Sequence, residues 1–149
     1  MDRLKLEVAA SLRELERLGA SIAAYCKRCG VDDKLSYALQ LVCDEWVTNV
    51  IVHGYADSPP AAGEPAIEIT LERPAHDKLV LTFVDRAPPF DPLTRPEPNV
   101  DLSVDERDVG GLGIHFIKNI MDRCEYERVG ERNRLTLTKR LGTQGERPA

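Results

Sequence analysis

Glu45, Asn49 and His53 are spaced four residues apart within the apolar run LVCDEWVTNVIVHG, residues 41–54. A helix would place them along one side, partly rotated from its apolar stripe. An Asn side chain offers a neutral oxygen that can coordinate Mg²⁺, an ion that prefers oxygen ligands. A carboxylate one turn away can orient or deprotonate an attacking hydroxyl. The spacing therefore indicates a candidate site, although a solvated helix edge has the same pattern.

Asp85 begins a second candidate segment, DRAPPFDP, at the end of an alternating apolar stretch. A carboxylate at a strand end can accept a hydrogen bond from a ligand amino group, although an Asp that starts a turn is also common there. Pro88 and Pro89 keep the chain extended, and Phe90 adds apolar area, either to a pocket or to the core. The segment is compatible with one wall of a ligand pocket.

Gly110, Gly111 and Gly113 precede an apolar stretch with helical spacing, GIHFIKNIMD. Glycine allows the backbone to approach a ligand closely, and free N–H groups at a helix N-terminus favour anions. Phosphate is the first candidate ligand. A helix start that only needs a tight turn explains the same glycines, because short glycine motifs match by chance.

Alternating and helical patterns predict the elements that must position these residues. Ser11 and Glu14 match a capping box for the first helix, and Asp32 or Asp33 caps the second. The expected elements are a strand over 3–8, a helix ending before Gly30, a helix over 33–53, strands over 66–72 and 78–85, a helix over 112–121, and strands over 123–128 and 132–140. This order predicts an α+β two-layer sandwich, a mainly antiparallel sheet with helices on one face. One domain would span 1–141, followed by a disordered tail over 142–149.

Composition excludes several classes of function. The chain has 149 residues, 42% of them hydrophobic and 30% charged, with a net charge of −5 and scattered basic residues. Nucleic-acid binding needs a basic face, so we expect no nucleic-acid partner. No apolar run approaches a membrane span and the N-terminus lacks a signal-peptide core, so we expect a cytoplasmic protein without membrane contact. Cys26 and Cys29 form a CxxC pair without further ligands nearby, which favours reduced thiols over a zinc site.

Taken together, the three segments resemble a known family. DEWVTNVIVHGY (44–55) looks like the N-box of the anti-sigma-factor serine/threonine kinases of the GHKL, or histidine-kinase-like, ATPase superfamily. VDRAPPFDP (84–92) looks like its first glycine box, and GGLGIHFIKNIMD (110–122) like its second. NRLTLTKR (133–140) resembles its closing strand. The resemblance covers nearly the whole chain and implies a Bergerat-type ATP-binding fold.

The resemblance also implies roles for single residues, with ATP and Mg²⁺ as the ligands. Glu45 corresponds to the general base, Asn49 to the Mg²⁺ ligand and Asp85 to the acid that accepts from the adenine amino group. Residues 93–109 correspond to an ATP lid. The nucleotide contacts implied by position are Asn49, His53, Asp85, Ala87, Phe90, Gly110, Gly111, Leu112, Gly113 and Thr136.

The implied function is phosphorylation of a STAS-type anti-sigma-factor antagonist by a homodimer that also binds a sigma factor. One departure matters, because the first glycine box of the family has Gly where this chain has Ala87. If the backbone of residue 87 needs a positive φ, alanine adopts it less readily than glycine, and ATP affinity would fall. A non-catalytic partner-switching module that sequesters a regulatory protein is therefore the second hypothesis. The catalytic fragment of a histidine kinase ranks third, because we expect no dimerising helical hairpin with a phosphoacceptor His.

Overall fold

The structure is a computed structural model that describes residues 3–90, 92 and 111–142. Its elements follow the sequence as β1 (Arg3–Ala9), α1 (Glu14–Arg28), α2 (Asp33–Asn49), the π-helix η1 (Val50–Gly54), β2 (Pro65–Ala75), β3 (Lys78–Asp85), α3 (Gly111–Ile120), β4 (Arg123–Val129) and β5 (Arg132–Arg140). The predicted lid, residues 93–109, lies outside the described residues, as do Gly110 and the tail from residue 143 onward.

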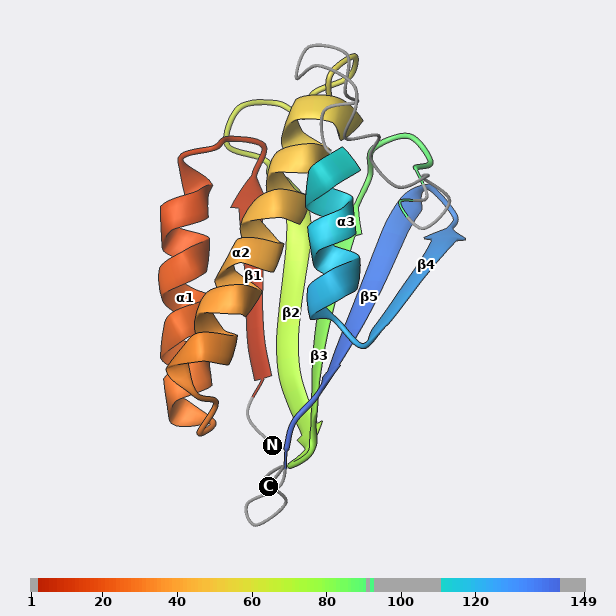
Figure 1. Cartoon of the computed structure of the whole chain (residues 1–149). Helices are drawn as coiled ribbons and strands as arrows, with labels where there is room; N and C mark the ends of the chain where they lie inside the picture. Colours follow the sequence, from red (N-terminus) through yellow and green to blue (C-terminus); the bar gives the residue numbers. More distant parts are fainter. Residues whose placement is uncertain (1–2, 91, 93–110, 143–149) are drawn as a thin grey trace.

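The strands form one five-stranded antiparallel sheet in the order β1-β2-β3-β5-β4 (Figure 1). Alternate residues of β3 are buried, from Leu79 to Asp85, and those between them are half-buried. Successive strand residues point to opposite faces, so one face of the sheet carries the core. The register places Asp85 of β3 opposite Asn133 of β5, which brings together two polar residues that are far apart in sequence.

α1, α2 and α3 all cover that apolar face (Figure 1). α2 contributes the buried residues Leu39, Val42 and Trp46, and α3 contributes Ile114 and Ile117 to the same core cluster. The hydrophobic burial of these stripes, about 25 cal/mol per Å² of apolar surface, holds the helices on the sheet. The prediction of an α+β two-layer sandwich with helices on one face is confirmed.

The start of the first helix differs from the prediction. The Glu14 carboxylate accepts from the Ala9 N–H at 3.0 Å, whereas a capping box would direct it to the N–H of Ser11. The Ser11 N–H already donates to the Ala9 carbonyl at 2.8 Å, because the chain turns tightly after β1. The predicted capping box is therefore wrong, and Glu14 ties the helix to the end of the strand instead.

The second helix begins as predicted and ends differently. Asp32 caps it, since its carboxylate accepts from the Leu35 N–H at 2.8 Å. After Asn49 the predicted α-helix widens into η1, and the Tyr55 N–H donates to the Val50 carbonyl five residues back. Single π turns of this kind are frequent at functional sites. This turn changes the direction of His53 relative to Glu45 and Asn49.

None of the described helices is long and apolar enough to cross a bilayer. All four cysteines are free thiols. Burial raises the pKa of the Cys26 and Cys43 thiols, which disfavours the reactive thiolate form. Within the CxxC segment at the end of α1, Cys26 is buried and Cys29 is half-buried.

Candidate nucleotide-binding site

A pocket of about 300 Å³ lies between the end of α2, η1, the loop after β3 and the start of β5. Figure 1 shows the ends of α2 and β3 at the upper end of the sheet. Its lining residues are Trp46, Asn49, Val50, His53, Gly54, Asp57, Asp85, Ala87, Pro88, Pro89, Phe90 and Asn133. The structure therefore brings together five of the predicted nucleotide contacts, from two segments that are far apart in sequence.

Asp85 is the buried acid of this pocket, with 3% of its surface exposed. Its Oδ1 accepts from the Ala87 N–H and from the Asn133 amide, both at 2.9 Å. Burial raises the pKa of Asp85, and the hydrogen bonds from Asn133 and Ala87 and the charge of Arg128 oppose that rise. No described residue donates to Oδ2. The carboxylate is thus held in one orientation, with a second oxygen available to a ligand amino group.

Ala87 fits its position without backbone strain. No non-glycine residue in the described part of the chain has a positive φ, so Ala87 needs none of glycine's freedom. Its buried methyl lies against Gly54, where an added Cβ would approach the Ala87 Cβ to 3.1 Å. Glycine at position 54 therefore provides the space that the methyl at position 87 fills. The departure from the family's glycine box does not distort the loop.

Asn49 and an aromatic pair form the side of the pocket contributed by α2. Trp46 stacks on Phe90 with ring centroids 6.2 Å apart and planes 17° apart. Asn49 is 6% exposed, and its side chain has no hydrogen bond to another described residue. Because Asn49 lines the pocket, its amide is available to a ligand or ion bound there.

Glu45 lies one turn before Asn49, where α3 crosses α2. A Cβ added to Gly113 would lie 2.5 Å from Glu45 Oε2 and 3.4 Å from its Cδ, so any larger residue at this crossing would have to displace the end of the Glu45 side chain. The side chain of Glu45 is otherwise exposed. The glycine-rich segment and the helix with Glu45 and Asn49, predicted separately, therefore meet in space. Gly111 and Leu112 form the first turn of α3.

Of two further predicted nucleotide contacts, His53 and Thr136, only His53 lines the pocket. His53 reaches the pocket from η1 and is exposed. Thr136 does not line the pocket: it is half-buried in β5, between the buried Leu135 and Leu137. Strand alternation points its side chain to the sheet face opposite the helices. The structure therefore does not place Thr136 at this pocket, whereas Asn133, three residues earlier on the face of the core, lines it.

Asn133 and Tyr55 are site residues that the sequence analysis missed. Asn133 lies in phase with the buried Leu135 and Leu137, so strand alternation was a usable signal. The Tyr55 hydroxyl donates to the Ala66 carbonyl at 2.7 Å and accepts from the Arg86 N–H at 2.8 Å. It thereby fixes the backbone directly after Asp85 to β2. No local pattern in the sequence indicates that contact.

Comparison with known proteins shows the family of the chain. The family model described as the histidine kinase-like ATPase domain matches residues 8–139. The chain belongs to this family. This chain is 30% identical over 105 residues to the serine/threonine-protein kinase BtrW of Bordetella bronchiseptica. The matched residues cover 70% of this chain and 70% of BtrW.

Solved structures show the same fold. The histidine kinase-like ATPase domain matches the RsbU and RsbW domains of Rv1364c from Mycobacterium tuberculosis with a TM-score of 0.69 at 15% identity, covering 100% of this chain and 34% of that one. It matches the SiaB–SiaC complex of Pseudomonas aeruginosa with a TM-score of 0.60 at 14% identity, over 93% and 89% of the two chains. The resemblance to the anti-sigma-factor kinases of the superfamily, based on three short segments, is confirmed.

Proposed function

We propose that this chain is an ATP-dependent serine/threonine protein kinase of the anti-sigma-factor type. The observation that carries the proposal is the arrangement along α2. Asn49 lines the same pocket as Asp85, and Glu45, one turn earlier, contacts Gly113 of the glycine segment. A nucleotide with its base at Asp85 and its phosphates toward α3 would bring the terminal phosphate near Glu45.

Several pocket residues then have a defined role. The open oxygen of Asp85 accepts from the exocyclic amino group of adenine, while Trp46 and Phe90 supply apolar surface for the ring. The phosphates lie near the N-terminus of α3, where glycine backbone allows a close approach and the helix dipole favours negative charge. His53 also lines the pocket.

The residues present fit a Mg²⁺ ion that is held mainly by the nucleotide. No cluster of three His, Cys, Asp or Glu side chains suited to a metal occurs within the described ranges. Mg²⁺ in kinase sites commonly takes few protein ligands and several phosphate oxygens, and the unbonded amide of Asn49 offers one such oxygen. When bound, the ion neutralises phosphate charge.

Glu45 acts on the substrate hydroxyl. Its carboxylate accepts the proton as the Ser or Thr oxygen forms a bond to the γ-phosphorus. The bond from that phosphorus to the β–γ bridging oxygen breaks, and ADP leaves with the electron pair. The exposure of Glu45 leaves room for a protein substrate to approach. The similarity to BtrW, a protein named a serine/threonine-protein kinase, supports this reaction class.

The proposed substrate is a STAS-type anti-sigma-factor antagonist in the cytoplasm, with a homodimer of this chain as the kinase and a sigma factor as second partner. These partners follow from the family resemblance. The experiment that tests them is incubation with labelled ATP, Mg²⁺ and candidate STAS proteins, followed by detection of phosphoserine or phosphothreonine. Stable binding of such a protein without transfer would favour the sequestering module.

Gly113→Ala tests whether Glu45 needs its present position. The new methyl would displace the flexible end of Glu45, while alanine favours helix α3 by about 0.5–1 kcal/mol over glycine. We expect a stable protein whose transfer rate falls about 100-fold, the cost typical of a misplaced catalytic group. Single-turnover transfer and thermal unfolding are the measurements.

Gly142→Ala is the matched control, because nothing lies within 4 Å of a Cβ added there. In a Glu45→Gln background, Gly113→Ala should cause no further loss of transfer, since both changes act through one carboxylate. Full additivity of the two losses would show that Gly113 acts independently of Glu45.

Asp85→Asn tests the base-reading acid and its pH dependence. Burial raises the pKa of Asp85 above its ordinary 3.8, and only the ionised carboxylate has two acceptor oxygens. Adenosine affinity should therefore fall as the pH drops through that raised pKa. In Asp85→Asn the affinity should be about 10–100-fold weaker, the loss of one charged hydrogen bond, and this component of the pH dependence should vanish.

Adenosine is the suitable ligand because it has no phosphate that titrates. His53 and Asp57 also line the pocket, so the comparison between wild type and Asp85→Asn isolates the contribution of Asp85. Identical pH profiles in the two proteins would remove Asp85 from base recognition.

A further inference from the structure

The loop that follows β3 forms one wall of the pocket without belonging to a helix or strand. Within residues 86–90, every backbone N–H group is bonded to a side chain. The Arg86 N–H donates to Tyr55, the Ala87 N–H to Asp85, and the Phe90 N–H to the Tyr126 hydroxyl at 3.2 Å. Pro88 and Pro89 have no N–H to satisfy. The conformation of this wall is therefore set by surrounding side chains.

The carbonyl groups of the loop are bonded to β4 and β5. The Ala87 carbonyl accepts from Arg128 Nη1 at 2.8 Å and from the Asn133 amide at 3.0 Å. The Pro88 carbonyl accepts from the same amide at 3.1 Å. Arg128 therefore bonds the loop directly and shares the Ala87 carbonyl with Asn133.

Asn133 is itself oriented by β4. Its Oδ1 accepts from the Tyr126 hydroxyl and from Arg128 Nη1, the latter at 3.2 Å. With this oxygen taken, the amide nitrogen is directed at Asp85 and the loop. The assignment of oxygen and nitrogen follows from this network, in which every contact pairs a donor with an acceptor.

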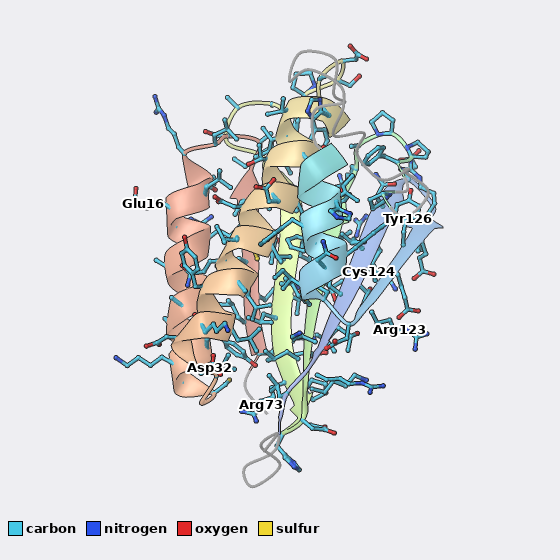
Figure 2. All side chains as sticks on the ribbon, viewed as in Figure 1. Glu16, Asp32, Arg73, Arg123, Cys124 and Tyr126 are labelled. Atoms are coloured by element: carbon cyan, nitrogen blue, oxygen red, sulfur yellow. The ribbon has the colours of Figure 1, made fainter. Side chains whose placement is uncertain are left out.

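We infer that Tyr126 and Arg128 of β4 are positioning residues of the nucleotide pocket. Neither belongs to the pocket lining, so both act through the loop and through Asn133. Figure 2 shows Tyr126 at the upper part of β4, toward the end of the sheet where the pocket lies. The inference rests on the proposed function, because it assigns a role in holding the wall against which the base would bind.

Arginine suits this role better than lysine. The planar guanidinium donates in several fixed directions, and here it also reaches the Gly130 carbonyl through Nε at 3.2 Å. A lysine retains the charge but cannot bond Ala87, Asn133 and Gly130 in this arrangement. Charge-assisted hydrogen bonds such as that to Ala87 are stronger than neutral ones.

The test compares Arg128→Gln, Arg128→Lys and Tyr126→Phe with wild type. Trp46 is the only tryptophan of the chain and stacks on Phe90, so its fluorescence reports both nucleotide binding and the wall itself. We expect ATP affinity to fall about 10-fold in Arg128→Gln, less in Arg128→Lys, and severalfold in Tyr126→Phe. Phosphoryl transfer at saturating ATP should stay within about twofold, because Glu45 and the phosphate end are unchanged.

Arg123→Gln is the matched control on the same strand. Arg123 pairs with Glu125 in solvent, its side chain is 71% exposed, and it points away from the helix layer (Figure 2). We expect wild-type ATP affinity in this variant. Thermal unfolding of each variant identifies a loss of fold, and Tyr126→Phe, which removes one hydroxyl, provides the test if Arg128→Gln is unstable.

The outcomes separate this inference from the proposed function. Wild type that fails to bind ATP would overturn the proposed function and the inference with it. Wild type that binds ATP, with unchanged affinity in folded Arg128→Gln and Tyr126→Phe, would overturn the inference alone. A reduced transfer rate at saturating ATP with an unchanged KM would also overturn it, because that pattern belongs to a group acting at the reacting phosphate.

Discussion

Glu45→Gln should leave ATP affinity within about twofold of wild type and slow phosphoryl transfer by about 10²–10⁴-fold, the range typical of a lost general base. The amide keeps the shape of the carboxylate and removes its ability to take a proton. That factor corresponds to roughly 3–5 kcal/mol of transition-state stabilisation. Glu45 is exposed and lies outside the apolar core, so the free energy of unfolding should change little. Single-turnover transfer from ATP to a cognate STAS protein is the measurement.

Glu16→Gln is the control for the charge change, because Glu16 is an exposed residue on α1 (Figure 2). It should transfer at the wild-type rate. Equal rates for Glu45→Gln and wild type would make Glu45 a solvated residue that merely packs against Gly113. If no STAS protein is phosphorylated even by wild type, the sequestering module becomes the better account of the chain.

Asn49→Ala should reduce Mg-ATP affinity by about 100-fold or more. Changing a residue that only hydrogen-bonds to a metal ligand typically costs about 10–100-fold, and removing a ligand itself should cost more. ATP affinity in the presence of a chelator should stay near the wild-type value. The two affinities separate because Asn49 is assigned to the ion, whereas Asp85 and the aromatic pair are assigned to the base. Calorimetric titration with and without Mg²⁺ measures both.

Asn119→Ala is the matched control, since Asn119 is exposed near the end of α3 and is not part of the pocket lining. Folding of Asn49→Ala is expected to survive, because the Asn49 side chain bonds no other described residue and its removal leaves no group unpaired. Unchanged Mg-ATP affinity in Asn49→Ala would disprove its assignment to the metal.

Local sequence patterns determined the elements and much of the site. The spacing of Leu39, Val42 and Trp46 predicted the apolar stripe of α2, and alternation predicted β2 through β5 within a few residues. These patterns are local because an amphipathic helix or strand must present its apolar residues at its own period. The four-residue spacing of Glu45 and Asn49 is equally local, and both lie on α2 as predicted.

The environment of each site residue depended on tertiary structure. Asp85 could be chosen from the sequence, but its partner Asn133 follows from the β3–β5 register, 48 residues away. Thr136 was matched to the pocket by position, but it lies on the opposite face of β5, and a shift of one residue reverses the face. Whether alanine at position 87 strains the backbone likewise depended on its φ and on the space left by Gly54.

Gly113 shows the same division between local and tertiary information. The sequence indicated glycines ahead of a helix and gave a phosphate as their reason. The structure adds that Gly113 is the point where α3 crosses α2 and rests on Glu45. Periodicity is a property of a few neighbouring residues. The sequence alone therefore determined the helices, the strands and the side chains that could take part in chemistry. Contacts between elements depend on packing and register across the whole domain, so only the tertiary structure decided which of those side chains meet.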